Sequence, residues 1–203
     1  ADGYLGELLA VDIQVLGPDF VDIASPMHWR HDRDLSGYNI LSMGIWYEAM
    51  IRWVPQATRV MAMTKVNVPR RFDENGNLRA VTIPDHVDIL CRLANGAQAH
   101  LRVSAVTGLS PGNEVWLYGT EGTIRLDQRL NVFGGRRGDA KLSEIPNPPE
   151  KQHSWRVEEE FVNSIRGRQE VTRTPFHVGV HYMEFTEAVT RSAQTGQAIA
   201  LPL

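Results

Sequence analysis

Cysteine is nearly absent from this chain, since Cys91 is the single cysteine among 203 residues. One cysteine forms no internal disulfide, and an unpaired thiol is typical of proteins from a reducing compartment, so we expect a cytoplasmic protein. Long runs of charge of one sign are also missing, and the net charge is only −3. Nucleic acids and membrane surfaces are therefore not the expected partners.

Three kinds of sequence segment are missing as well. There is no run of about 18 apolar residues, which argues against a membrane span, and there is no N-terminal secretion signal. A Gly-x-Gly-x-x-Gly fingerprint for a dinucleotide is lacking too, and the nearest string, Gly134 to Gly138, lies between strand-like segments and is typical of a hairpin loop. What is present, 42% hydrophobic and 22% charged residues, predicts a globular chain with one sizeable core, so we treat residues 1–203 as a single domain.

The clearest local pattern is a hairpin between residues 86 and 104. Two apolar rows alternate with polar residues on either side of Ala94-Asn95-Gly96. Both rows share a face only if the loop has an odd length, which predicts a three-residue connection with Gly96 at positive φ. The opposite face is polar except for Leu90, and it includes Asp88, Arg92, His100 and Arg102.

Helical periodicity appears in three places, about Tyr38 to Val54, Trp155 to Arg166 and His177 to Thr195. Strand-like segments lie between the first and second of these helices without strict alternation of strand and helix. The fold class predicted is therefore α+β: an open, mainly antiparallel β-sheet with the α-helices on one face.

Titratable side chains gather at one point, the loop that carries His28, His31, Asp32 and Asp34 ahead of the first helix. Loops that lead into a helix commonly build sites, although a solvated loop explains the same residues. His177 and His181 have helical metal-ligand spacing, but a third ligand is not evident nearby, so we predict no metal site.

Six segments follow one another along the chain: GYLGELLAVDI, WRHD with SGYNILSMGIW, HVDILCRLANGAQAHLRVSA, VWLYGTEGTIRLD, EEEFVNSIRG and EAVTRSAQTGQAIALP. In order and spacing they resemble the C-terminal domain of the glucose-fructose oxidoreductase / inositol dehydrogenase / MocA (Gfo/Idh/MocA) family. The resemblance covers essentially the whole chain. It implies the dihydrodipicolinate-reductase-like sheet that this domain has in the family.

The resemblance also implies a function. Family members are NAD(P)-dependent oxidoreductases of sugars, polyols and related small molecules, and an N-terminal Rossmann domain binds the nucleotide. The C-terminal domain binds substrate and forms homodimers or homotetramers through its sheet face. This chain, which starts at Ala1 without a methionine, would then be the second half of such a protein. We expect NAD or NADP to bind the intact protein and not this chain alone, and the family's Glu-Lys-Pro lysine to belong to the first half.

The family signature Gly-Gly-x-Leu-x-Asp-x-Gly-x-His-x-x-Asp falls on Ser36 to Met50, where Gly37 and Gly44 match glycines and are the predicted cofactor-side positions. The positions of the acid, the histidine and the second acid hold Ser42, Trp46 and Ala49. An imidazole accepts a hydroxyl proton during hydride transfer, and an indole does not. The catalytic residues therefore stay unknown. The resemblance and the loop cluster predict these substrate-binding residues: His28, His31, Tyr38, Ser42, Trp46 and Tyr47.

Three interpretations remain open. The intact protein is an active oxidoreductase whose base comes from elsewhere, such as the lysine of the first half, Tyr47, or the loop of His28 and His31. Alternatively, it is a catalytically degenerate relative that binds a nucleotide or sugar, with Trp46 stacked on a ring. The third interpretation is an oligomerisation module whose helix only packs into a core.

Overall fold

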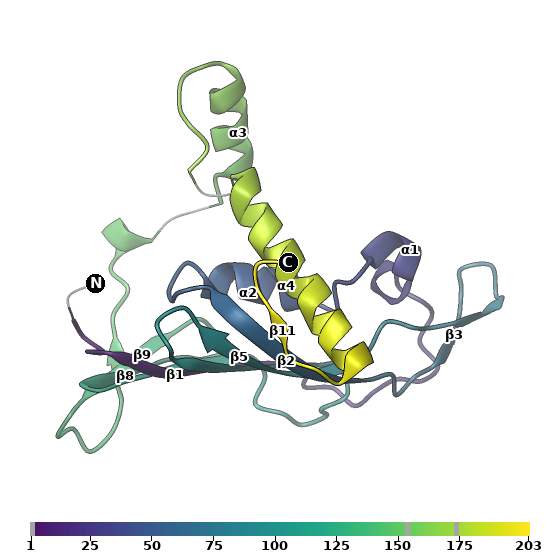
Figure 1. Ribbon diagram of the computed structural model, residues 1–203, viewed down its shortest axis with the longest axis horizontal. Helices are drawn as coiled ribbons and strands as arrows, with labels where there is room; N and C mark the ends of the chain where they lie inside the picture. Colours follow the sequence, from purple (N-terminus) through teal and green to yellow (C-terminus); the bar gives the residue numbers. More distant parts are fainter. Residues whose placement is uncertain (1–2, 153–154, 173–174) are drawn as a thin grey trace.

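A nine-stranded sheet forms the body of the chain (Figure 1), in a computed structural model that describes residues 3–152, 155–172 and 175–203. Its strand order is β10 (Ser143–Ile145), β9 (Val132–Arg136), β8 (Gly122–Leu126), β7 (Glu114–Gly119), β1 (Leu8–Leu16), β6 (Gln98–Ser104), β5 (His86–Leu93), β2 (Ala57–Lys65) and β11 (Ile199–Ala200). All neighbours are antiparallel except β1 and β6, which run parallel. The predicted α+β class with a mainly antiparallel sheet is confirmed.

The hairpin of β5 and β6 has the predicted geometry. Arg92 pairs with Gln98, and the backbone N–H of Leu93 donates to the carbonyl of Ala97 at 2.8 Å, which leaves a three-residue loop. Gly96 has a φ of 89°, a left-handed value at which glycine avoids the clash of a Cβ. The odd loop places both apolar rows on one face, where all eight residues are buried: Val87, Ile89, Cys91, Leu93, Ala97, Ala99, Leu101 and Val103.

Two helices cover this apolar face, α2 (Met43–Met50) and α4 (Phe176–Thr195), and Figure 1 shows both on the same side of the sheet. Their buried side chains join one hydrophobic core with those of β1, β2, β5, β6 and β7. The bounds of α4 agree with the predicted helix. No helix in the described parts of the chain is long and apolar enough to cross a membrane.

The first predicted helix, Tyr38 to Val54, is wrong in its extent. A separate short helix α1 (Arg33–Ser36) comes first, after the 3-10 turn η1 (Trp29–His31), and α2 begins only at Met43. The break has a backbone cause, because Gly37 has a φ of 58° and Leu41 a φ of 53°. A helix does not continue through residues with left-handed φ.

The second predicted helix, Trp155 to Arg166, departs from the prediction in another way. Helix α3 (Val157–Ile165) occupies the predicted residues, but it stands beyond the end of α4 and away from the sheet (Figure 1). Its periodicity indicated an apolar face without indicating what that face packs against. Between β10 and α3 lies a 3-10 turn, η2 (Pro149–Lys151), and a separate two-stranded sheet joins β3 (Arg70–Phe72) to β4 (Leu78–Ala80).

Buried polar groups tie the helices to strand β2. The ring of Tyr47 stacks on Phe185 of α4 at 3.6 Å between centroids, and its hydroxyl accepts a hydrogen bond from the backbone N–H of Ala57 at 3.1 Å. Ser192 of α4 accepts from the N–H of Ala62 at 2.9 Å and donates to the carbonyl of Gln197 at 2.7 Å. A buried backbone N–H without a partner is costly, so these bonds fix how α2 and α4 sit on the sheet.

We expect Tyr47→Phe to lower the free energy of unfolding by about 1–3 kcal/mol, because it leaves the buried N–H of Ala57 without an acceptor while the ring contact survives. Urea denaturation followed by circular dichroism measures the change. Ile45→Ala is the control, since Ile45 lies on the same helix but is 56% exposed. Equal stability of Tyr47→Phe and the wild type would contradict an anchoring role for the hydroxyl.

Candidate functional site

A cavity of about 380 Å³ opens at the edge of the sheet where β1 and β6 both end. These strands run parallel, so their carboxyl ends, Leu16 and Ser104, pair at this edge. Apolar groups form much of the lining, and four polar side chains join them: Arg30 of η1, Ser42, Asn113 and Ser104 of β6. The Ser104 hydroxyl is already hydrogen-bonded to a ring nitrogen of His86 at 2.9 Å. Ligand sites in proteins commonly combine an apolar wall with a few convergent polar groups.

Ser42 lines this cavity, and another residue caps the helix. Ser42 occupies the N-cap position of α2, yet its side chain makes no capping hydrogen bond. The side-chain oxygen of Asn39 instead accepts from the N–H of Gly44 at 3.1 Å. The Ser42 hydroxyl is therefore left available for a ligand.

The two signature glycines have explanations within the chain. A Cβ added to Gly44 would come 3.2 Å from the side-chain oxygen of Asn39, so glycine keeps this capping contact unhindered. Gly37 has open space around it, and its φ of 58° is what favours glycine there. A role for either residue in cofactor binding stays a prediction.

The loop histidines build local structure. The N–H of His28 donates to Nδ1 of His31 at 3.1 Å, and the N–H of Arg30 donates to Nδ1 of His28 at 3.3 Å, which closes a reciprocal cap around η1. Asp32 likewise caps α1 through the N–H of Asp34. Burial, together with the charge of Arg71 and with His28, lowers the pKa of His31. Substrate contact by His28 and His31 stays a prediction.

The remaining predicted substrate residues, Tyr38 and Trp46, are not in the lining of the Ser42 cavity. Tyr38 lines a different cavity, of about 480 Å³, with Phe176, Val180 and Met183 of α4. Trp46 is partly buried against the core, and its contact with a ligand also stays a prediction.

For Tyr47 the structure requires a correction. Its side chain is 1% exposed, stacked in the core and hydrogen-bonded to strand β2, so it does not face a cleft. Burial raises the pKa of its hydroxyl to about 12, which makes it a poor proton acceptor at neutral pH. Tyr47 is therefore neither a substrate ligand nor the missing base in this fold.

The cavity beside Ser42 has cationic and neutral polar groups, and the described part of the chain places no general base in its lining. Among the described residues, Arg30 is the only charged one there, and carboxylate, histidine and lysine side chains are lacking. Sequence reasoning predicted Ser42 but missed Arg30 and Asn113. Arg30 lay within the recognised WRHD segment, whereas nothing local distinguished Asn113. Nor do three or more His, Cys, Asp or Glu side chains gather as a metal site in the part of the chain that the structure describes.

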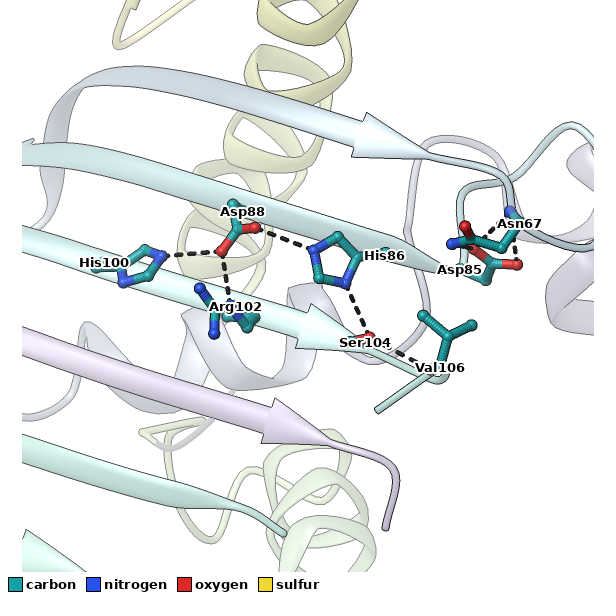
Figure 2. Close-up of polar contacts among 8 residues, drawn as sticks. All are labelled: Asn67, Asp85, His86, Asp88, His100, Arg102, Ser104 and Val106. Carbon is teal, nitrogen blue, oxygen red and sulfur yellow. Dashed lines mark hydrogen bonds and ion pairs between the residues drawn. The ribbon is translucent and has the colours of Figure 1, made fainter. Parts of the chain in front are cut away.

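The sheet face opposite the helices carries a second polar cluster, centred on Asp88 (Figure 2). Its carboxylate accepts from Arg102 at 2.8 Å and lies 3.0 Å from ring nitrogens of both His86 and His100. Partial burial by itself would raise the pKa of Asp88, but these hydrogen bonds outweigh burial and lower the pKa to about 2. Asp12 on β1 extends the cluster, 3.9 Å from His100.

Comparison with protein families identifies the chain. The model of the GFO/IDH/MocA C-terminal domain matches residues 1–125, and the chain belongs to this family. The sequence matches none of the curated proteins with which it was compared.

Solved structures share the fold at low sequence identity. Levoglucosan dehydrogenase in complex with NADH and L-sorbose superposes with a TM-score of 0.83 at 20% identity, over 99% of this chain and 60% of that one. An NAD-binding oxidoreductase from Klebsiella pneumoniae gives 0.83 at 17%, over 99% and 61%. A super-repressor mutant of Gal80p from Saccharomyces cerevisiae gives 0.70 at 16%, over 98% and 59%. The chain thus spans about 60% of the length of the structures it matches.

We expect Asp88→Asn to destabilise the protein near neutral pH by about 1 kcal/mol at most, because the side chain is 35% exposed and solvent screens its ion pairs. The pKa of Asp88 is lowered from 3.8 to about 2 by folding, so its contribution is complete above 3.8 and is lost as pH falls towards 2. Urea titrations of wild type and variant across this range should converge at the acid end. Asp19→Asn, on an exposed loop, is the control; a constant difference at all pH values would contradict the assignment.

Proposed function

We propose that this chain is the substrate-binding and oligomerisation domain of an NAD(P)-dependent oxidoreductase that acts on a sugar, a polyol or a related small molecule. The nucleotide-binding domain belongs, in this proposal, to a part of the protein outside residues 1–203, and the protein is cytoplasmic. The family membership and the fold shared with levoglucosan dehydrogenase support it. Its substrate and its choice between NAD and NADP depend on the whole protein.

One observation carries the proposal: Ser42, at the position of the family's acid, lines a ligand-sized cavity together with Arg30 and Asn113. Its hydroxyl is not used to cap α2. A helix that only packed into a core would have no need of a cavity with polar side chains at its N-terminus. In the proposal, this cavity receives the substrate, and Gly37 and Gly44 lie on the cofactor side.

The proton acceptor comes from outside this cavity. An arginine side chain is not a proton acceptor, and neither Ser42 nor Asn113 is a base. The lysine of the family's nucleotide-binding domain is the candidate that the resemblance provides. The chain's own residues would position the substrate, exclude water and shape the pocket.

The second candidate function is a catalytically degenerate binding or oligomerisation module of the same fold. The absence of a general base from the lining of the Ser42 cavity favours it. A super-repressor is also among the proteins that share this fold. Incubation of the full-length protein with NAD or NADP and a panel of sugars and polyols decides between the two, because only the oxidoreductase produces the reduced cofactor.

We also propose that two or more copies associate through the sheet face that lacks helices. Three exposed apolar side chains adjoin there: Met61 and Leu90 pair across β2 and β5, and Met63 is next to the Asp88 cluster. Apolar contacts beside charged, hydrogen-bonded groups are typical of a wet protein–protein interface.

In the full-length protein we expect Ser42→Ala to raise KM several-fold and to change kcat little, because the hydroxyl contacts substrate without transferring a proton. Trp46→Phe should likewise act on KM if the indole shapes the pocket. Steady-state kinetics with the best substrate of the panel measures both. Loss of turnover at unchanged KM in Ser42→Ala would place the hydroxyl in a proton relay.

Leu90→Asp should dissociate the oligomer, because it places a charge in the apolar part of the proposed interface, where Leu90 is 60% exposed in the single chain. Light scattering at tens of micromolar measures the mass. Leu109→Asp is the matched control, since Leu109 is 83% exposed on a loop outside the sheet. A wild-type protein that is already monomeric would contradict the proposed self-association.

A further inference from the structure

Arg30 lines the cavity and carries a guanidinium group that forms no ion pair with the residues that the structure describes. The group stacks over the ring of Trp29 at 4.0 Å from its centroid. Within residues 3–152, 155–172 and 175–203 it forms no ion pair, and the only hydrogen bond of the residue uses its backbone N–H. Arginine has five N–H donors in a planar fork, a geometry that matches a carboxylate or a phosphate.

Two other polar side chains of the cavity, Ser42 and Asn113, are also available for a ligand, whereas the hydroxyl of Ser104 is hydrogen-bonded to His86. Ser42 makes no capping bond, and Asn113 has no side-chain hydrogen bond to the residues that the structure describes. Together they offer a hydroxyl and an amide, each of which both donates and accepts. Alcohol groups of a polyol have the same double capacity, and the apolar residues Leu16, Leu41 and Val103 can contact its C–H groups.

The charge of the cavity limits which kinds of anion can bind there. Arg30 contributes one positive charge, and no second cation from the described residues lines the site. A carboxylate carries one negative charge and matches the guanidinium fork through two parallel hydrogen bonds. A phosphate monoester carries nearly two charges at neutral pH, which one arginine would leave partly uncompensated. The volume of about 380 Å³ lies within the range of small-molecule sites.

We propose that the cavity selects a sugar acid, a polyhydroxylated substrate with one carboxylate, which Arg30 binds while Ser42 and Asn113 hold its hydroxyl groups. This inference rests on the proposed function, since it specifies the substrate class of the same site. It makes Arg30 the residue that distinguishes acidic from neutral sugars. The Trp29 ring holds the guanidinium in place and so reduces the entropy lost when the anion binds.

The experiment is a calorimetric titration of the full-length protein with D-glucuronate, D-galacturonate and D-gluconate. Each acid is compared with the neutral sugar of the same configuration, and D-glucose 6-phosphate is a separate probe. The titrations are repeated with Arg30→Gln, Arg30→Lys and the control Arg129→Gln, an exposed loop arginine. We expect at least one acid to bind about tenfold or more tightly than its neutral partner, as a charged hydrogen-bonded pair provides.

Arg30→Gln should remove the preference for acids, and Arg129→Gln should retain it. Arg30→Lys should keep part of the preference, because lysine has the charge of arginine but not its planar fork. Equal binding of acid and neutral sugar, a preference that survives Arg30→Gln, or stronger binding of the phosphate would overturn the inference. Turnover with NAD or NADP is measured in parallel. Oxidation of neutral sugars without a preference for acids would refute only the sugar-acid inference. Binding of an acid without turnover of any sugar would refute only the oxidoreductase function.

Discussion

Strand β1 lies between β6 and β7, parallel to the first and antiparallel to the second, and the positions of the other elements depend on this placement. The first strand along the chain is thus central in the sheet. Parallel neighbours require a long crossover, and here the chain between β1 and β5 includes the loops of Arg30 and Ser42, helix α2 and strand β2. Because β1 and β6 end at the same edge, residues from that crossover meet Asn113, which directly precedes β7, around one cavity.

The same sheet separates two kinds of chemistry by the alternation of its side chains. On the face under α2 and α4, apolar residues of five strands form the core, and the polar atoms there are used to anchor the helices, as Tyr47 and Ser192 do. On the other face, Asp88 holds two histidines and an arginine in one hydrogen-bonded cluster (Figure 2). The cavity lined by Ser42 lies at the end of the strands, where both faces stop.

Local patterns predicted local structure well. The hairpin of β5 and β6 followed from alternation and loop parity, and α4 from its period. The start of α2 was not predicted correctly, because nothing in the sequence indicates that Leu41 has a left-handed φ. Tyr47 was wrongly predicted to bind substrate, although its spacing from Met43 and Met50 is that of a buried helical stripe. The convergence of Arg30 and Asn113 depends on the parallel pairing of β1 and β6, a long-range contact that periodicity does not reveal.

The hydrogen bond between Ser192 and Ala62 has a consequence for the outer edge of the sheet. Strand β11 has only two residues, so it leaves much of the outer edge of β2 without a partner strand. Ser192 occupies the N–H of Ala62, and the N–H of Leu201 occupies the carbonyl of Thr58. Backbone groups that would otherwise recruit a strand from a neighbouring molecule are thereby engaged. A helical side chain and a C-terminal segment thus protect this border against the edge-to-edge stacking from which fibrous aggregates grow.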